Sequence, residues 1–401
     1  MRDRSFIALC VLILVNQLGF GIITPVLPSY ARSFGLDAGH IGMVIGIYGF
    51  ARFIANVPAG QLSDRRGRRQ VLMLGTVITS IASALMATAD SLPQLLAYRL
   101  LAGIGAATVI TAGQIMVGDI ATPDNRGRLM SVYQGVFLFG VGLGPIPGGL
   151  LADAFGLRAP FIAYAAFSLG ACALAMLMIR ETKPTAAQAQ ARADLEPKGA
   201  PIPEVRSTIT SRAFLLIGFV SFAQFIGRTG ALFTIMPLLG REVVHLTASQ
   251  IGYTLFTVNA LNVATIYFSG MLADRIGRKP VIAPATLIGG AGIALFAFSH
   301  SFEMFLLSAA LWGFGSGISG PAPAAYVADL APEQVRARVF GFFRSVSDAG
   351  NIVGPIVLAA LADRYGYEVP MLVTAALIMA AGALFWAFAP EFYRRRPAPA
   401  A

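Results

Sequence analysis

Long runs of apolar residues, separated by short charged or turn-rich breaks, dominate this sequence. Each run is close to the roughly 20 residues that a helix needs to cross a hydrocarbon core of about 30 Å. Apolar residues make up 56% of the 401 positions and charged residues 12%, a composition that excludes an ordinary soluble fold. The runs lack the two-residue alternation of a membrane barrel, so helices must satisfy the backbone in lipid.

The runs predict twelve membrane-spanning helices, near residues 6–29, 41–62, 71–89, 94–117, 130–152, 159–179, 213–238, 251–271, 281–299, 303–327, 339–361 and 369–389. The N-terminus, every second loop and the C-terminal tail together hold 22 of the 30 Lys and Arg residues. Positive charge is retained on the cytoplasmic side. We therefore expect a multi-pass protein of the cell (inner) membrane with both termini cytoplasmic.

Several classes of function are disfavoured by composition. The net charge of +10 is scattered over many loops rather than gathered on one face, so nucleic acid is not an expected partner. Cys10 and Cys172 lie in apolar runs, and the three histidines lack metal-ligand spacing, so we expect neither a metal nor another cofactor. No nucleophile with an acid and a base is assembled at one interface, so we do not expect an enzyme.

The chain repeats itself at a spacing of 210 residues. Residues 60–69 align with residues 270–279 at six identities in ten, and the same offset relates Asp119 to Asp329 and Asp153 to Asp363. Two six-helix halves in parallel orientation imply a pseudo-two-fold axis along the membrane normal and a shared cavity. The predicted domains are a bundle over 1–180, a cytoplasmic linker over 181–212, a second bundle over 213–390 and a basic cytoplasmic tail over 391–401.

Four motifs carry a resemblance to a known family. They are the loop with Gly60, Asp64, Arg65, Gly67 and Arg68; Arg99 with Gly103 and Gly105; Gly140 with Gly144, Pro145, Gly148 and Gly149; and Leu18-Gly19 followed by Pro25 and Pro28. Together they resemble the major facilitator superfamily, and within it the twelve-span drug:proton antiporters. The resemblance covers roughly residues 6–390. It implies an all-α fold of two pseudo-symmetric six-helix bundles that rock about a central cavity.

The loop after the second span is expected to act as a conformational latch. Its glycines permit a tight turn, and Asp64 can accept hydrogen bonds or be held by arginine. In the family this loop tethers the first half to the start of span eleven. The expected latch residues are Gly60, Asp64, Arg65, Gly67, Arg68, Asp274, Arg275, Arg338 and Arg344. The alternative is an anchor of positive charge that only sets topology.

The fifth span carries the motif that the family associates with antiporters. Gly140, Gly144, Gly148 and Gly149 recur at helical spacing, so a neighbouring helix can approach one nearly bare face, and Pro145 removes a backbone donor and bends the helix. The functional interpretation is a seal between the halves that favours exchange over leak. Ordinary small-residue packing is the alternative.

Charged side chains inside spans are expensive, about 2.5–3.5 kcal/mol at a helix centre. Arg52 and Asp348 each lie ten residues from a predicted cytoplasmic helix end, which is near the midplane. In the family, spans two and eleven face each other, so we expect Arg52 and Asp348 to pair and to couple proton binding to rocking. A static pair is the alternative. Arg99 is expected either to relay protons or to extend toward the outer interface.

The residues expected at the substrate cavity are Gln17, Thr24, Gln114, Gln224, Arg228 and Asn351. The sequence thus predicts a monomeric secondary active exporter of a small amphipathic drug or metabolite in exchange for protons, with multidrug efflux and antibiotic resistance as its expected roles. Its expected partners are that small molecule, protons and the lipid bilayer. The alternative is a facilitator or symporter for a sugar or organic anion.

Overall fold

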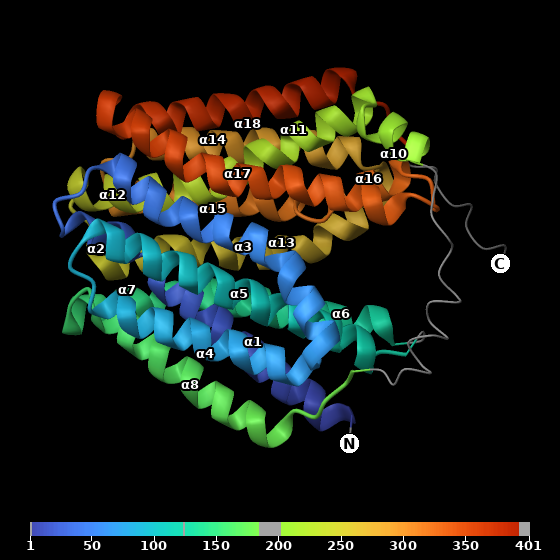
Figure 1. Ribbon diagram of the computed structural model, residues 1–401. Coiled ribbons are helices and arrows are strands. Elements are labelled where there is room, and N and C mark those ends of the chain that lie inside the picture. Colours follow the sequence, from blue (N-terminus) through green and yellow to red (C-terminus); the bar gives the residue numbers. More distant parts are fainter. Residues whose placement is uncertain (1, 123–124, 184–201, 393–401) are drawn as a thin grey trace. The chain divides into compact units, whose positions relative to one another are not determined.

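The computed structural model describes residues 2–122, 125–183 and 202–392, and within those residues the regular secondary structure is entirely helical (Figure 1). Among the described residues, eleven helical segments are long and apolar enough to span a membrane. A twelfth span results when Ala248–Ile266 and Phe268–Ile276, bent by 45°, are taken together. The predicted all-α membrane fold is confirmed.

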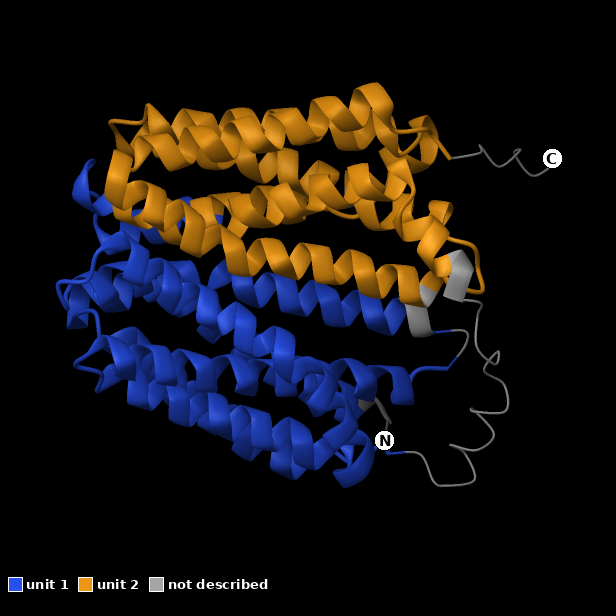
Figure 2. Cartoon of the chain, turned by 45° about the horizontal axis from the view of Figure 1, so that its top comes forward, with its two compact units in different colours: residues 1–195, 240–256 blue, residues 196–239, 257–401 orange. Residues whose placement is uncertain are grey.

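The helices form two compact units (Figure 2). Unit 1 comprises residues 1–195 and 240–256, and unit 2 comprises residues 196–239 and 257–401. Unit 1 contains α1 (Arg2–Ile23), α2 (Leu27–Arg32), α3 (Ala38–Arg66), α4 (Arg68–Ala87), α5 (Leu92–Ile120), α6 (Arg126–Leu143), α7 (Pro145–Phe155) and α8 (Ala159–Met178). It also contains the end of α12 (Met236–Glu242) and the first residues of α13 (Ala248–Ile276).

Unit 2 contains α10 (Ile202–Ile209), α11 (Arg212–Ile226), η1 (Gly227–Ile235), α14 (Lys279–Ala297), α15 (Phe302–Ser319), α16 (Ala322–Leu330), α17 (Arg336–Tyr365) and α18 (Glu368–Phe388), with the remainder of α12 and α13. Helix α10 falls within the predicted linker 181–212, of which residues 184–201 lie outside the described residues. Most of the predicted basic tail, residues 393–401, also lies outside them.

Among the described residues, four predicted spans consist of more than one helix, and one of them, the fifth, divides into α6 and α7 at Gly144. The first breaks at residues 24–26, where Pro25 lies, and the tenth breaks between α15 and α16 beside Pro321. Proline lacks the backbone N–H that continues a helix, which explains both breaks. The seventh span changes within its length from α11 to the π-helix η1, residues Gly227–Ile235.

The sequence repeat is also a repeat of helix packing. Gly103 on α5 lies against the backbone of Tyr48 on α3, and Gly313 on α15 lies against the backbone of Val258 on α13. Gly313 is the equivalent of Gly103, and Val258 is the equivalent of Tyr48, each 210 residues later in the sequence. Small residues thus let the corresponding helices approach closely in each unit.

Span seven contains two residues more than span one. Leu18 packs on Gly144 in unit 1, and Ile226 packs on Gly354 in unit 2. The two glycines are 210 residues apart, but Leu18 and Ile226 are only 208 residues apart. After each span, a side chain accepts a hydrogen bond from a backbone amide three residues later: Asp37 from His40, and Thr247 from Gln250. Asp37 and Thr247 are again 210 residues apart. The extra residues therefore lie between Ile226 and Thr247, where η1 is found, and each π-type hydrogen bond encloses one more residue than an α-type bond.

Candidate functional site

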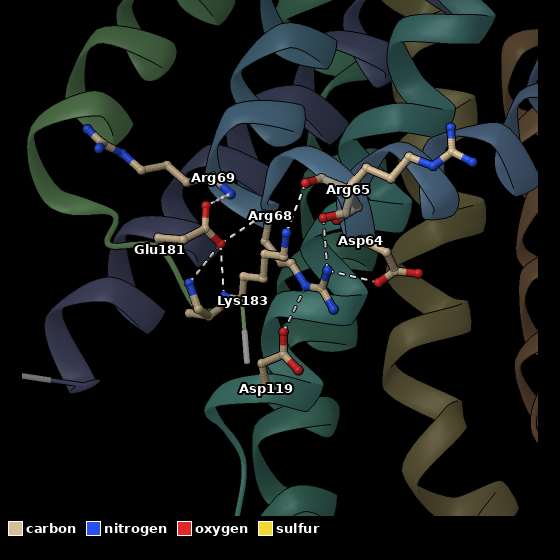
Figure 3. A network of polar contacts seen from close by, with 9 residues as sticks. Asp64, Arg65, Arg68, Arg69, Asp119, Glu181 and Lys183 are labelled. Atoms are coloured by element: carbon tan, nitrogen blue, oxygen red, sulfur yellow. Dashed lines mark hydrogen bonds and ion pairs between the residues drawn. The ribbon is translucent and has the colours of Figure 1, made fainter. Parts of the chain in front are cut away.

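The turn between α3 and α4 carries the expected latch loop, and its charged residues form a network (Figure 3). Gly67 has a φ of 102°, which residues with a Cβ rarely adopt. The Arg68 guanidinium lies 2.8 Å from the Asp64 carboxylate and 3.0 Å from that of Asp119 on α5. The Arg68 and Asp119 side chains are 8% and 6% exposed, so this ion pair is buried. Gly60 lies inside α3, so the expected turn is made at Gly67 alone.

Glu181, just after α8, completes this network, although the sequence did not single it out. Its carboxylate accepts hydrogen bonds from the backbone amides of Arg68 at 2.8 Å and Arg69 at 3.2 Å. Burial alone would raise the pKa of the Glu181 carboxyl, but hydrogen bonds from backbone amides outweigh this effect and lower the pKa. Lys183 donates to the carbonyl of Arg65 at 2.9 Å. Glu181 thus fastens the end of α8 to the start of α4.

The apolar packing of unit 1 places these charged groups. Val71 and Leu72, one turn after Arg68, are fully buried in one core cluster together with Val117 on α5 and Ile179 after α8. The three chain segments that supply Arg68, Asp119 and Glu181 are therefore held together by apolar packing as well as by their polar contacts. Van der Waals contact of this kind is the main force between helices in lipid.

Unit 2 repeats the network at the offset of 210. Gly277 also has a φ of 102°. The Arg278 guanidinium lies 2.6 Å from Asp274 and 3.1 Å from Asp329, and the amide of Lys279 donates to Glu391 at 2.8 Å. Burial alone would lower the pKa of Arg278, but its bonds to both carboxylates outweigh this and raise it. The common offset of Glu181 and Glu391 is the sequence signal that could have identified both.

The side chains of four further latch residues are exposed. Arg65 and Arg275 are exposed at the ends of α3 and α13. Arg338 is exposed near the start of α17. Arg344 is 67% exposed, and its guanidinium lies 3.6 Å from Asp348 one turn further along α17. Because the loop at Gly67 belongs to unit 1 and α17 to unit 2, the tether between them stays a prediction.

Arg99 and Asp348 are both buried. Arg99 on α5 is 5% exposed; it donates to the carbonyl of Val44 at 3.3 Å and its guanidinium lies 4.3 Å above the Tyr48 ring. Among the described residues, no carboxylate forms an ion pair with Arg99. Tyr48 in turn stacks on Phe20 of α1 with ring centroids 5.5 Å apart. The sequence analysis singled out Arg99 but did not predict this stack.

Asp348 is 6% exposed and lies beside Asn351, whose amide is 3.4 Å from its carboxylate. Arg52 is half-buried on α3. Asp348 belongs to unit 2 and Arg52 belongs to unit 1. Their pairing, and its role in proton coupling, therefore stays a prediction.

The glycines of the antiporter motif line a close helix contact within unit 1. A Cβ at Gly140, Gly144 or Gly148 would overlap the backbone of α1. A Cβ at Gly149 would instead overlap the backbone of Ala248 and Ser249 at the start of α13. The motif thus packs mainly on span one, and Gly149 is the member that contacts residues 240–256. Pro145 begins α7 directly after Gly144.

Two polar contacts fasten residues 240–256 within unit 1, and sequence reasoning missed both. The Asp153 carboxylate, at the end of α7, accepts from the backbone amides of Ala248 at 3.1 Å and Ser249 at 2.9 Å. Arg32, the last residue of α2, forms an ion pair with Glu242 at 2.8 Å. The offset of 210 could have suggested the second contact, because Arg32 and Glu242 occupy equivalent places in the repeat.

The residues predicted for the substrate cavity are divided equally between the units. Gln17, Thr24 and Gln114 lie on or near α1 and α5 in unit 1, and Thr24 donates to the carbonyl of Phe20 at 2.8 Å. In unit 2, Gln224 donates to Thr286 at 3.1 Å and to Ser319 at 2.8 Å. Arg228 on η1 lies 5.9 Å from the Phe233 ring centroid, and Asn351 contacts Asp348. Their common role in binding stays a prediction.

Metal binding finds no support in the described residues. No group of three or more His, Cys, Asp or Glu side chains in them is arranged to hold a metal ion. Cys10 and Cys172 are both free thiols. What the described residues do present is a set of paired charges at the ends of helices and a few buried charges inside them.

Comparisons with known proteins find relatives that match most of the chain. The chain is 28% identical over 90% of its length, and over 86% of the relative, to the multidrug resistance protein MdtG of Enterobacter lignolyticus. It is 27% identical over 92% of its length, and over 90% of the relative, to the class B tetracycline resistance protein of Escherichia coli. A bacterial homologue of the human lysosomal transporter Spinster shares the fold, with a TM-score of 0.80 at 16% identity over 96% of each chain.

A model of the Major Facilitator Superfamily matches residues 9–265 and 230–401, which together cover both halves. The match agrees with the twelve spans, the repeat and the loop at Gly67. The chain therefore belongs to the Major Facilitator Superfamily, and it is a multi-pass membrane transporter of small molecules rather than an enzyme.

Proposed function

We propose that this transporter is a secondary active exporter, which moves a small amphipathic drug or metabolite out of the cell by alternating access in exchange for protons. Its similarity to a multidrug resistance protein and a tetracycline resistance protein supports export of a drug. The observation that carries proton exchange is the carboxylate of Asp348, which is 6% exposed in the interior of a span. A carboxylate inside a span is energetically costly, and such residues usually have a functional role.

Asp348 acts as the proton carrier in this proposal, and Arg52 is the cation that competes with the proton. Within unit 2, Arg344 at 3.6 Å and Asn351 at 3.4 Å already face the Asp348 carboxylate. Pairing with Arg52 keeps Asp348 ionised in one state, and separation favours uptake of a proton in the other. A proton falling through about 100 mV releases about 2.3 kcal/mol, enough to sustain a gradient of roughly 50-fold for a neutral substrate.

Arg99 supports the same cycle as a fixed buried cation. Its contacts with Tyr48 and Val44 hold it inside unit 1, where lipid would reject it. We further propose that both termini are cytoplasmic in the cell membrane, because 22 of 30 basic residues fall on that side. The functional unit is a monomer, since one chain supplies both halves of the repeat.

Proteoliposomes test this function directly. The purified chain is reconstituted with a pH-sensitive dye, and tetracycline and a panel of neutral, cationic and anionic compounds are offered in turn. We expect a substrate gradient to drive proton movement in the opposite direction. Movement of substrate and protons in the same direction indicates a symporter, and substrate movement without protons indicates a facilitator; either result contradicts the proposal.

Variants separate coupling from binding. We expect Asp348→Asn to keep exchange of labelled for unlabelled substrate but to lose proton-driven export, and Arg52→Ala to weaken coupling without an additional loss in the double variant. Arg336→Gln is the matched control, because it changes an exposed charge at the start of the same helix, away from Asp348. Full coupling in Asp348→Asn contradicts the assignment of the carrier.

A further inference from the structure

A patch of two basic and two aromatic residues surrounds the last turn of α18. Helix α18 packs against both α11 and α14 (Figure 1). Arg212, the first residue of α11, places its guanidinium 4.6 Å from the Phe388 ring centroid. Lys279, the first residue of α14, places its ammonium 5.7 Å from the Trp386 ring centroid. We call Arg212, Lys279, Trp386 and Phe388 the headgroup patch.

The two rings of the headgroup patch face outward although they are large and apolar. Trp386 is 51% exposed and Phe388 is 50% exposed, and Leu215, one turn into α11, is 59% exposed. In a membrane protein such residues face lipid, and aromatic rings near helix ends mark the level of the headgroups. The headgroup patch therefore lies where a lipid's chains meet its phosphate.

The charges of the headgroup patch remain available for an anion. In the part of the chain that the structure describes, neither Arg212 nor Lys279 forms an ion pair. Stacking engages the face of a guanidinium and leaves its N–H groups, which lie in the plane, free to bind phosphate. The Lys279 ammonium donates to the carbonyl of Ala389 at 2.8 Å, which uses one of its three protons. The neighbouring acid, Glu391, accepts from the backbone amide of Lys279.

The fold does not require these aromatic residues, as the repeat shows. At the offset of 210, unit 1 has Met176 and Met178 in place of Trp386 and Phe388, and Arg69 in place of Lys279. The backbone contact is shared, because the Arg69 amide donates to Glu181 as the Lys279 amide donates to Glu391. Packing alone is thus satisfied by methionine, and the rings of unit 2 have another use.

We propose that the headgroup patch binds an anionic phospholipid of the surrounding bilayer. Arg212 and Lys279 contact the phosphate groups, while Trp386, Phe388 and Leu215 pack against the glycerol and the upper part of the acyl chains. Each basic residue near an anionic membrane surface contributes enough to change affinity about fivefold. A lipid with two phosphates contacts both sides of α18 and binds more tightly than one with a single phosphate.

Native mass spectrometry of the full chain in detergent tests the site with four probes: cardiolipin, phosphatidylglycerol, phosphatidylethanolamine and inorganic phosphate. We expect the first two to remain bound, cardiolipin the more strongly, and the zwitterionic lipid to be lost. Arg212→Gln and Lys279→Gln should each weaken binding about fivefold. The matched control is Arg206→Gln, which removes the same charge six residues before Arg212 and has no aromatic partner among the described residues.

The double variant Trp386→Met, Phe388→Met provides a second test, because it installs the residues that unit 1 carries at the equivalent places. It should weaken lipid binding while thermal stability stays unchanged. Three outcomes overturn the proposal: equal loss in Arg206→Gln, equal retention of phosphatidylethanolamine, or binding of inorganic phosphate that depends on the same residues. The aromatic variant keeps the test valid if Lys279→Gln, which also loses the bond to Ala389, proves unstable.

Discussion

The turn at Gly67 in unit 1 and the turn at Gly277 in unit 2 have the same charged residues in the same register but different surroundings. The ion pair between Arg68 and Asp119 has side chains 8% and 6% exposed, whereas the pair between Arg278 and Asp329 has side chains 13% and 31% exposed. Glu181 accepts from the amides of Arg68 and Arg69 at the start of α4, and Glu391 accepts from the amide of Lys279 at the start of α14. The two copies of a duplicated motif therefore need not contribute equally to the stability of their units.

The largest expected difference concerns the buried carboxylate. Asp119→Ala leaves Arg68 buried without its main partner, and breaking such a pair costs about 3–5 kcal/mol. Asp329→Ala breaks a more exposed pair and should cost about 1 kcal/mol or less. Thermal unfolding in detergent, followed by size-exclusion chromatography, measures both.

Asp64→Ala serves as the control in unit 1, because Asp64 contacts the same arginine but is 67% exposed. It should resemble Asp329→Ala. Equal destabilisation by Asp119→Ala and Asp329→Ala shows that burial does not distinguish the two turns.

The glycine contacts give the next largest difference. A methyl group at Gly144 would overlap the carbonyl of Leu18 and lie 2.6 Å from the Cα of Gly21, whereas one at Gly354 would lie 3.0 Å from the Cα of Ile226. Gly144→Ala should therefore cost about 1–3 kcal/mol through overpacking, and Gly354→Ala less. Gly135→Ala on α6 is the control, because a Cβ there meets nothing within 4 Å. A larger loss in Gly354→Ala contradicts the comparison.

The cap at α13 tests why residues 240–256 belong to unit 1. Asp153→Asn weakens the hydrogen bonds to the Ala248 and Ser249 amides, and loss of a cap of this kind costs about 1 kcal/mol. Hydrogen exchange should accelerate at those two amides, while the rest of α13 stays protected. Ser249→Ala removes only the hydrogen bond that the Ser249 hydroxyl donates to the Asp153 carboxylate, and it should have a smaller effect. Unchanged exchange in Asp153→Asn shows that packing at Gly149 alone holds the segment.

The smallest expected effect is a dependence on pH. Because the folded-state pKa of Glu181 is lowered from its ordinary 4.5, the stabilisation is present above that value and is lost as the pH falls through the folded value. Unfolding temperatures between pH 7 and pH 3 should fall less steeply in Glu181→Gln than in the unaltered chain. Because the carboxylate is partly exposed, the difference should be about 1 kcal/mol or less. Parallel curves contradict the role given to Glu181.

The sequence was sufficient to predict the spans, the repeat and the charged loop, because each leaves a pattern of residue types. It could not predict the partners of Glu181 and Asp153, because these carboxylates bind backbone amides, which every residue has. Arg68 and Glu181 are also 113 residues apart. Only the equivalence of Glu181 with Glu391 within the repeat indicated a shared role.

The stack of Phe20, Tyr48 and Arg99 was missed for a different reason. Each residue comes from another helix, and helix periodicity predicts which residues share a face but not which faces meet. The π-helix was missed because its nine residues are apolar enough to fit an α-helical span equally well. Position in space, rather than residue type, decides both features.

The surplus length of span seven gives this chain a means of adjustment that span one lacks. Removing one residue from Gly227–Ile235 would rotate the segments on either side of the deletion by about 100° relative to each other. Arg228, at the beginning of that stretch, would then keep its depth but present its charge at a new angle to Met236 and the residues beyond. Insertions and deletions here thus change the direction of a side chain relative to the far end of the span, which point substitutions do not do.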